Sequence, residues 1–147
     1  MQISQLNRTD ADVIKIAFKN VDGSGSITTG MGIAFVGAGA SIDGVSATKH
    51  TAAQAKTFGG VASGDVPING WGTATVWGLA NSVLFSNVGT SITVTRGDTL
   101  IPGAVAGTFF STITDAGMST VLYKYVVAAD NVTISAAAYT RGIVRAF

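Results

Sequence analysis

The 147-residue sequence contains no cysteine and no glutamate, and it has a single histidine. Without cysteine it has neither a disulfide framework nor a thiolate metal site. Every acidic residue is aspartate, which favours turns and caps, whereas glutamate favours helix surfaces. These absences argue against exposed helices.

Charge is also scarce. Charged residues make up 12% of the chain, against about 25% in ordinary globular domains. The formal net charge is +1 and no basic stripe is present, so we expect no nucleic-acid partner. The length fits one domain that buries roughly 70% of its unfolded surface. So low a charge suggests a protein that has much of its surface against neighbours in an assembly.

Two long uncharged stretches, residues 27–42 and 66–95, could suggest a membrane span. A spanning helix needs about 20 predominantly apolar residues. Glycines interrupt the first stretch, and the second is rich in threonine, serine and asparagine. The N-terminus has no basic-then-apolar signal pattern. We therefore expect no membrane-spanning helix.

The second uncharged stretch contains the clearest strand pattern. From Trp71 to Trp77, tryptophan and threonine at the odd positions alternate with glycine, alanine and valine at the even positions. This is the period of a strand. The two tryptophans would then share one face. Because aromatic side chains bury so much area, we expect both in the core. The alternative is that one anchors a protein contact.

Strand patterns recur along the rest of the chain, between turns rich in glycine, asparagine and aspartate. Residues 13–21 alternate, with Ile14, Ile16 and Phe18 facing one side. Further strands are expected at 27–36, 58–62, 82–86, 91–95, 99–103, 107–114, 119–128, 132–135 and 142–147. The single plausible helix covers 48–57. Short, regularly spaced strands predict a mainly β protein, a small β-barrel or β-sandwich with at most one or two short helices.

The first twelve residues are polar and are interpreted as an N-terminal arm, with a single β-domain over 13–147. Ile3 and Leu6 give the arm two apolar anchors. Ordering such a segment costs about 1–2 kcal/mol per residue in backbone entropy. We therefore expect it to order only against a partner surface.

Catalytic patterns are weak. His50 and Asp43 invite a hydrolytic triad, but no Gly-x-Ser-x-Gly nucleophile turn occurs, and His50 is expected at an exposed helix end. The aspartates lie singly at turns. Residues 37–43 lack the remaining features of a phosphate loop, and residues 22–26 lack the later ligands of a calcium loop. The tripeptide Arg96-Gly-Asp98 fits a tight turn. We predict no enzyme, no cofactor and no metal site.

Two segments have a residue pattern that is found in a known protein family. They are residues 60–79, GVASGDVPINGWGTATVWGL, and residues 92–103, ITVTRGDTLIPG. The second segment contains a Gly-Asp-x-Leu corner that begins at Gly97. Across residues 58–147 the chain resembles the capsid decoration, or cement, proteins of tailed bacteriophages. The resemblance implies a homotrimer at three-fold positions of the virion shell, with the major capsid protein as partner and no catalysis or cofactor. It transfers no functional residues.

Ile3, Leu6, Trp71 and Trp77 are the candidate partner contacts under this interpretation. Two other interpretations stay open: a tail or fibre component of a virion, and a carbohydrate-binding β-sandwich. A row of surface aromatic residues with polar neighbours would favour sugar binding. A symmetric apolar patch would favour assembly.

Overall fold

The computed structural model describes residues 13–36, 43–51, 57–86, 92–103, 105–111, 126–134 and 137–146. They form eleven strands: β1 (Ile14–Asn20), β2 (Gly32–Phe35), β3 (Ser46–Lys49), β4 (Phe58–Ala62), β5 (Trp71–Phe85), β6 (Ile92–Val94), β7 (Thr99–Pro102), β8 (Phe109–Ser111), β9 (Val126–Ala128), β10 (Val132–Ile134) and β11 (Ala138–Arg145). No α-helix occurs among the described residues. The predicted mainly β fold class is confirmed.

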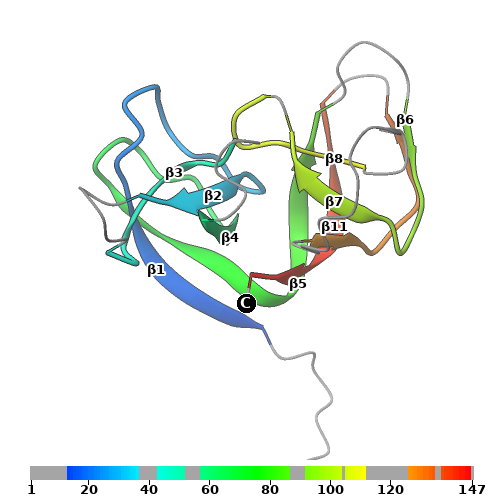
Figure 1. The fold of residues 1–147 in the computed structure, drawn as a ribbon, viewed down its shortest axis with the longest axis horizontal. Helices are drawn as coiled ribbons and strands as arrows, with labels where there is room; N and C mark the ends of the chain where they lie inside the picture. The colour runs from blue at the N-terminus through cyan, green and yellow to red at the C-terminus, as the bar shows by residue number, and fades with distance from the viewer. Residues whose placement is uncertain are drawn as a thin grey trace, which may run out of the picture.

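The strand pairings close into two rings that share β5 (Figure 1). In the first ring the order is β1-β3-β2-β4-β5, and β5 pairs back with β1. In the second ring the order is β5-β11-β9-β7-β8, and β8 pairs back with β5. Most neighbours are antiparallel, but β1–β3 and β5–β8 are parallel. A separate two-stranded ribbon joins β6 to β10.

The shared strand β5 is 15 residues long and bends sharply where it passes from one ring to the other (Figure 1). Thr75 pairs with Lys15, but the next residue of β1, Ile14, pairs with Trp77, so β5 carries one extra residue here. Such a bulge bends a strand and increases its twist. Gly78 follows with φ of +95°, a conformation that side chains disfavour. The predicted strands at 71–77 and 82–86 are therefore parts of one bent strand.

The two rings have separate cores. The first contains Phe18, Ile27, Ile33, Ala47, Ala62, Val66 and Ala74. The second is larger and contains Phe58, Val61, Ala80, Val83, Phe85, Val94, Leu100, Phe109, Val126, Ala128 and Val144. Strand β4 contributes to both, because Ala62 belongs to the first core while Phe58 and Val61 belong to the second. It therefore forms part of the seam between the rings.

A buried polar network supplements the small first core. The Asn20 side chain donates to the carbonyl oxygens of Val66 (3.0 Å) and Gly25 (3.3 Å), and its own oxygen accepts the N–H of Asp22 (2.8 Å). The Asp22 carboxylate accepts the N–H groups of Ser24 (2.8 Å) and Lys49 (3.0 Å). Burial raises the pKa of Asp22, but a hydrogen bond from the Ser24 hydroxyl, the two N–H groups and the charge of Lys49 together outweigh it, and the pKa ends below its ordinary value. The network ties the turn after β1 to β3.

Several sequence predictions need correction. The helix expected at 48–57 is wrong where it can be checked: Thr48 and Lys49 belong to β3, and residues 52–56 lie outside the described residues. Antiparallel pairing with Ile33 and Ala34 of β2 holds Lys49 and Thr48 in the strand. The strand expected at 27–36 is reduced to β2, and β11 begins earlier than expected. Ile14 is 55% exposed, although Phe18 on the same predicted face is buried.

The expected arm at 1–12, with Ile3 and Leu6, lies outside the described residues. In the part of the chain that is described, no helix has the length and apolar character to cross a membrane.

Candidate functional site at the bend of β5

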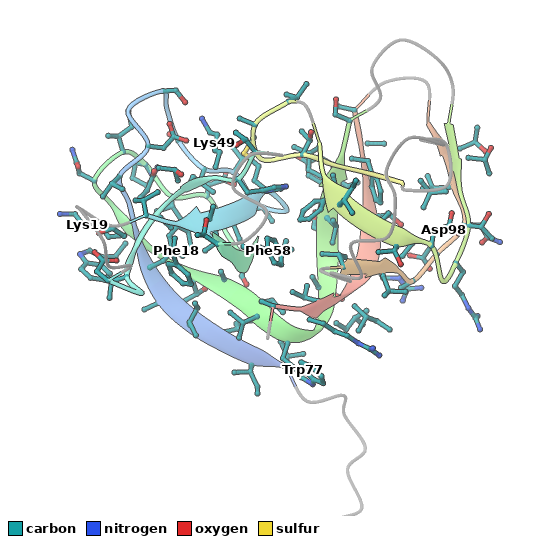
Figure 2. The ribbon with its side chains drawn as sticks, viewed as in Figure 1. Phe18, Lys19, Lys49, Phe58, Trp77 and Asp98 are labelled. Carbon is teal, nitrogen blue, oxygen red and sulfur yellow. The ribbon has the colours of Figure 1, made fainter. Side chains whose placement is uncertain are left out.

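Trp77 lies on the outer side of the bend of β5 (Figure 2) and is 42% exposed. Its pairing partners are Ile14 on β1 and Arg145 on β11. The Arg145 guanidinium carbon lies 6.0 Å from the centre of the indole ring, at the edge of the range for a cation–π contact. Ile14 and Ile143, two residues before Arg145, are also exposed. Together they form an apolar surface bordered by a positive charge.

Trp71 begins β5 at the other end of the first ring and is 64% exposed. Its partner across the sheet is Lys19. Ile68, in the preceding loop, is exposed as well. The two tryptophans are six positions apart in the sequence, or roughly 20 Å along β5. They therefore belong to two surfaces rather than to one row.

The expectation that both tryptophans lie in the core is wrong. Gly72 and Ala74 take the inward positions, and a Cβ added to Gly72 would come within 2.1 Å of Val66. The first ring is too narrow there for a large side chain, so the small residues face in and the tryptophans face out. The predicted common face also relied on unbroken alternation, which the bulge at Val76 interrupts.

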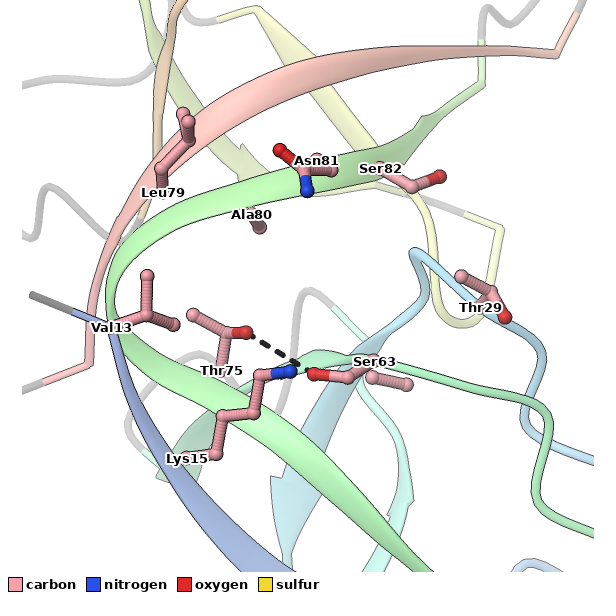
Figure 3. A pocket seen from close by; sticks show the side chains of 10 residues that line it. Val13, Lys15, Thr29, Ser63, Thr75, Leu79, Ala80, Asn81 and Ser82 are labelled. Atoms are coloured by element: carbon pink, nitrogen blue, oxygen red, sulfur yellow. Dashed lines mark hydrogen bonds between the residues drawn. The ribbon is translucent and has the colours of Figure 1, made fainter. Parts of the chain in front are cut away.

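A pocket of about 230 Å³ opens on the inner side of the same bend (Figure 3). Its lining is Val13, Lys15, Thr29, Ala62, Ser63, Thr75, Leu79, Ala80, Asn81 and Ser82. These residues come from β1, the turn before β2, the end of β4 and the middle of β5. The sequence prediction missed the pocket, because it exists only where β5 folds back over its own first half.

Three of the polar residues that line the pocket form side-chain hydrogen bonds. The hydroxyl oxygens of Ser63 and Thr75 are 3.2 Å apart and hydrogen-bonded, and Thr75 is only 3% exposed. Thr29 donates its N–H (2.7 Å) and its hydroxyl (2.8 Å) to Asp65. These two bonds lower the pKa of the Asp65 carboxyl.

His50 lies at the seam between the rings and is completely buried. The centre of its imidazole lies 4.5 Å from the centre of the Phe109 side-chain ring, and 5.9 Å from that of Phe58 on β4. Phe109 belongs to the second ring of strands. Its backbone completes a triangle of hydrogen bonds: His50 N–H to Gly32 O, Gly32 N–H to Gly107 O, and Gly107 N–H to His50 O. The prediction of an exposed helix-end histidine is therefore wrong.

Neither ring nitrogen of His50 has a hydrogen-bond partner of normal geometry in the structure. Burial lowers the pKa of His50 to about 4, and the nearby backbone of Gly32 and Thr108 offsets only part of that shift. The imidazole is therefore neutral at physiological pH. A general base must reach the proton it removes, and this side chain is closed off by aromatic rings. Its place in the fold fits packing rather than catalysis.

The Arg96-Gly-Asp98 turn is as predicted. The Asp98 N–H donates to Thr95 O (2.9 Å), and Gly97 has φ of +96°. The Asp98 carboxylate is engaged in the turn, where it accepts the Thr95 N–H at 2.8 Å. Among the described residues no group of three or more His, Cys, Asp or Glu could hold a metal ion.

Fold and site together define an all-β protein of two fused rings, with exposed tryptophans outside and a polar pocket inside the bend. No protein-family model matches the sequence, and no curated protein is significantly similar to it.

Proposed function

We propose that this protein is a viral structural protein that decorates an icosahedral phage capsid, binding between subunits of the major capsid protein and stabilising the shell. The observation that carries the proposal is the outward placement of Trp71 and Trp77 on a charge-poor molecule. Tryptophan is enriched at the energetic centres of protein interfaces. Both belong to a segment that resembles decoration proteins.

The backbone setting of Trp77 suits an interface. Trp77 is flanked on both sides by paired strands, so its backbone needs no further ordering on binding. The roughly 20 Å along β5 between the two tryptophans would let one molecule contact two neighbours. We further propose a homotrimer, in which one of the two surfaces faces a second copy and the other faces the shell.

Capsid co-sedimentation tests the proposal. The protein is mixed with capsids of the major capsid protein encoded by the same genome, and the bound fraction is measured for wild type, Trp71→Ala and Trp77→Ala. Loss of an interface anchor costs about 2 kcal/mol, or roughly 30-fold in affinity. Thr73→Ala is the matched control, because Thr73 is exposed on the same strand. Wild-type binding by both tryptophan variants, or none by the wild type, would reject the proposal.

The N-terminal arm is a separate part of the proposal. We propose that Ile3 and Leu6 anchor residues 1–12 to a neighbouring subunit or to the shell. Deleting residues 2–11 should leave thermal melting unchanged and weaken capsid occupancy. Full occupancy by the truncated protein would exclude the role of the arm.

Sedimentation velocity of the purified chain at about 10 μM, above the dissociation constants of most stable oligomers, tests the trimer.

The structure gives less support to a carbohydrate-binding role. The two tryptophans do not form a row, and the pocket lining contains no aromatic side chain. Stacking on aromatic faces is therefore not available in the pocket described here.

A further inference from the structure

The pocket inside the bend of β5 has an unbalanced charge. Among the described residues that line it, Lys15 is the only charged one. In the described part of the chain no carboxylate forms an ion pair with Lys15; the described pair joins Arg141 to Asp130 on the second ring. Figure 3 shows the Lys15 side chain extending along the pocket toward the Ser63–Thr75 pair. An ammonium that has no carboxylate partner among the described residues and lies beside a concave surface attracts an anion.

The other polar side chains add hydrogen-bond donors. Ser63 and Thr75 have two hydroxyl hydrogens between them and use one in their mutual bond, so one remains to donate. Asn81 contributes an amide and Ser82 a hydroxyl on the facing part of β5 (Figure 3). Ser82 packs beside Gly30, where an added Cβ would come within 3.0 Å of its Oγ. The donors therefore stand on two sides of one small space.

Size and charge narrow the class of anion. At about 230 Å³ the pocket is below the range of about 300–1,000 Å³ typical of sites for drug-sized ligands. A single lysine suits one carboxylate group, with any second carboxylate of the same ligand left in solvent, whereas phosphate sites usually combine several cationic groups or backbone N–H donors. Val13, Leu79 and the two alanines provide an apolar wall that a short chain of methylene groups could contact.

We propose that this pocket binds a carboxylate on a short aliphatic stem, with Lys15 as its ionic partner and Ser63, Thr75, Asn81 and Ser82 as its hydrogen-bond donors. The carboxylate could belong to a free dicarboxylic acid or to a glutamate side chain of another polypeptide, since both present the same chemistry. The inference depends only on the pocket and is independent of capsid binding.

Nuclear magnetic resonance titration with glutarate tests this inference. The wild type should show saturable shifts of the Asn81 side-chain amide and of backbone signals around Ser63, with a dissociation constant on the order of 10 mM. Lys15→Gln should weaken binding at least about tenfold, and Lys15→Arg should retain most of it because the charge is kept. Lys19→Gln is the matched control, since Lys19 is on the same strand but outside the pocket.

Three results would overturn the inference: no saturable shift in the wild type, equal binding by Lys15→Gln, or tighter binding of inorganic phosphate than of glutarate. A second arm compares a short peptide containing one glutamate with the same peptide containing glutamine. Tighter binding of the glutamate peptide than of glutarate would identify a polypeptide as the source of the carboxylate. Preference for glutarate would identify a free acid. Either preference supports the carboxylate site.

Discussion

The two rings of strands are both closed around a core, but different kinds of side chain fill the two cores. The second ring is filled by apolar side chains, among them three phenylalanines. The first has one fully buried phenylalanine, Phe18, and adds the hydrogen-bonded pair Asn20 and Asp22. In an apolar core, the cost of a substitution depends on the volume removed and on how far the neighbours relax into the space. A buried polar network instead depends on every hydrogen-bond partner being present. We therefore expect the rings to respond differently to substitution.

The largest expected effect is in the second core. Phe109 is fully buried and contacts both His50 and Phe58. Phe109→Ala should lower the free energy of unfolding by about 3–5 kcal/mol, because it removes a large side chain and leaves a cavity at the seam. Chemical denaturation measures the loss. If hydrogen exchange in β1–β4 accelerates as much as in β7–β11, the rings unfold as one unit and the contrast between them is only local.

The next effect comes from acid. The pKa of His50 is about 4 in the folded protein and about 6.5 when unfolded, so the unfolded state takes up the proton first. Stability should fall by about 3 kcal/mol as the pH drops from 6.5 to 4. The aspartates with lowered pKa values add their own loss below about pH 5, as the unfolded carboxyl groups begin to take up protons. Urea denaturation across this range measures the slope.

His50→Leu is the control for the acid effect. It removes the titrating group together with two unpartnered nitrogens, so stability at pH 7 should change little and the slope between pH 6.5 and 4 should flatten. An unchanged slope in this variant would assign the acid sensitivity to other groups.

Gly32 tests the seam itself. A Cβ at this position would lie 2.0 Å from Nδ1 of His50 and 2.8 Å from Phe109. Gly32→Ala should therefore cost about 3 kcal/mol through overpacking. Gly64→Ala is the matched control, because nothing lies within 4 Å of its added Cβ. Similar melting temperatures for the two variants would show that His50 can move aside.

The smallest of these effects concerns the polar network of the first ring. Asn20→Ala removes the donor to Val66 O and the acceptor for the Asp22 N–H. Leaving buried groups unsatisfied should cost about 1–2 kcal/mol, less than the loss of Phe109. Faster hydrogen exchange confined to the first ring would support the expectation that the two rings respond differently. A loss in unfolding free energy equal to that of Phe109→Ala would contradict it.

Local patterns predicted the strands whose signal is local. Residues 13–21 alternate and form β1, and the turn at Gly97 follows from residue types that accept a positive φ. The continuity of β5 was not predictable, because it depends on pairing with β11, more than 50 residues away in sequence. Alternation indicates which residues share a face. It does not indicate which face is inside, and here Gly72 and Ala74 rather than the tryptophans point inward.

The site was less predictable than the fold. Trp71 and Trp77 were identified as possible contacts, but their exposure depends on the width of the first ring. His50 is followed by a helix-like run of alanines, and its burial is set by Gly32 and Gly107 from distant parts of the chain. Lys15 gives no signal as a pocket residue, since strand pairing brings Ser63 to the same pocket and the bend of β5 brings Asn81 there.

The sharing of β5 also has a consequence for biosynthesis. All strands of the first ring lie between Ile14 and the first half of β5, whereas the second ring cannot close until β11 has been made. As the chain leaves the ribosome from its N-terminus, the first ring can close while the second half of β5 still has an unpaired edge. Such an edge is a site for aggregation. The exposed edge of β5 therefore stays unpaired until β11 has been synthesised and can pair with it.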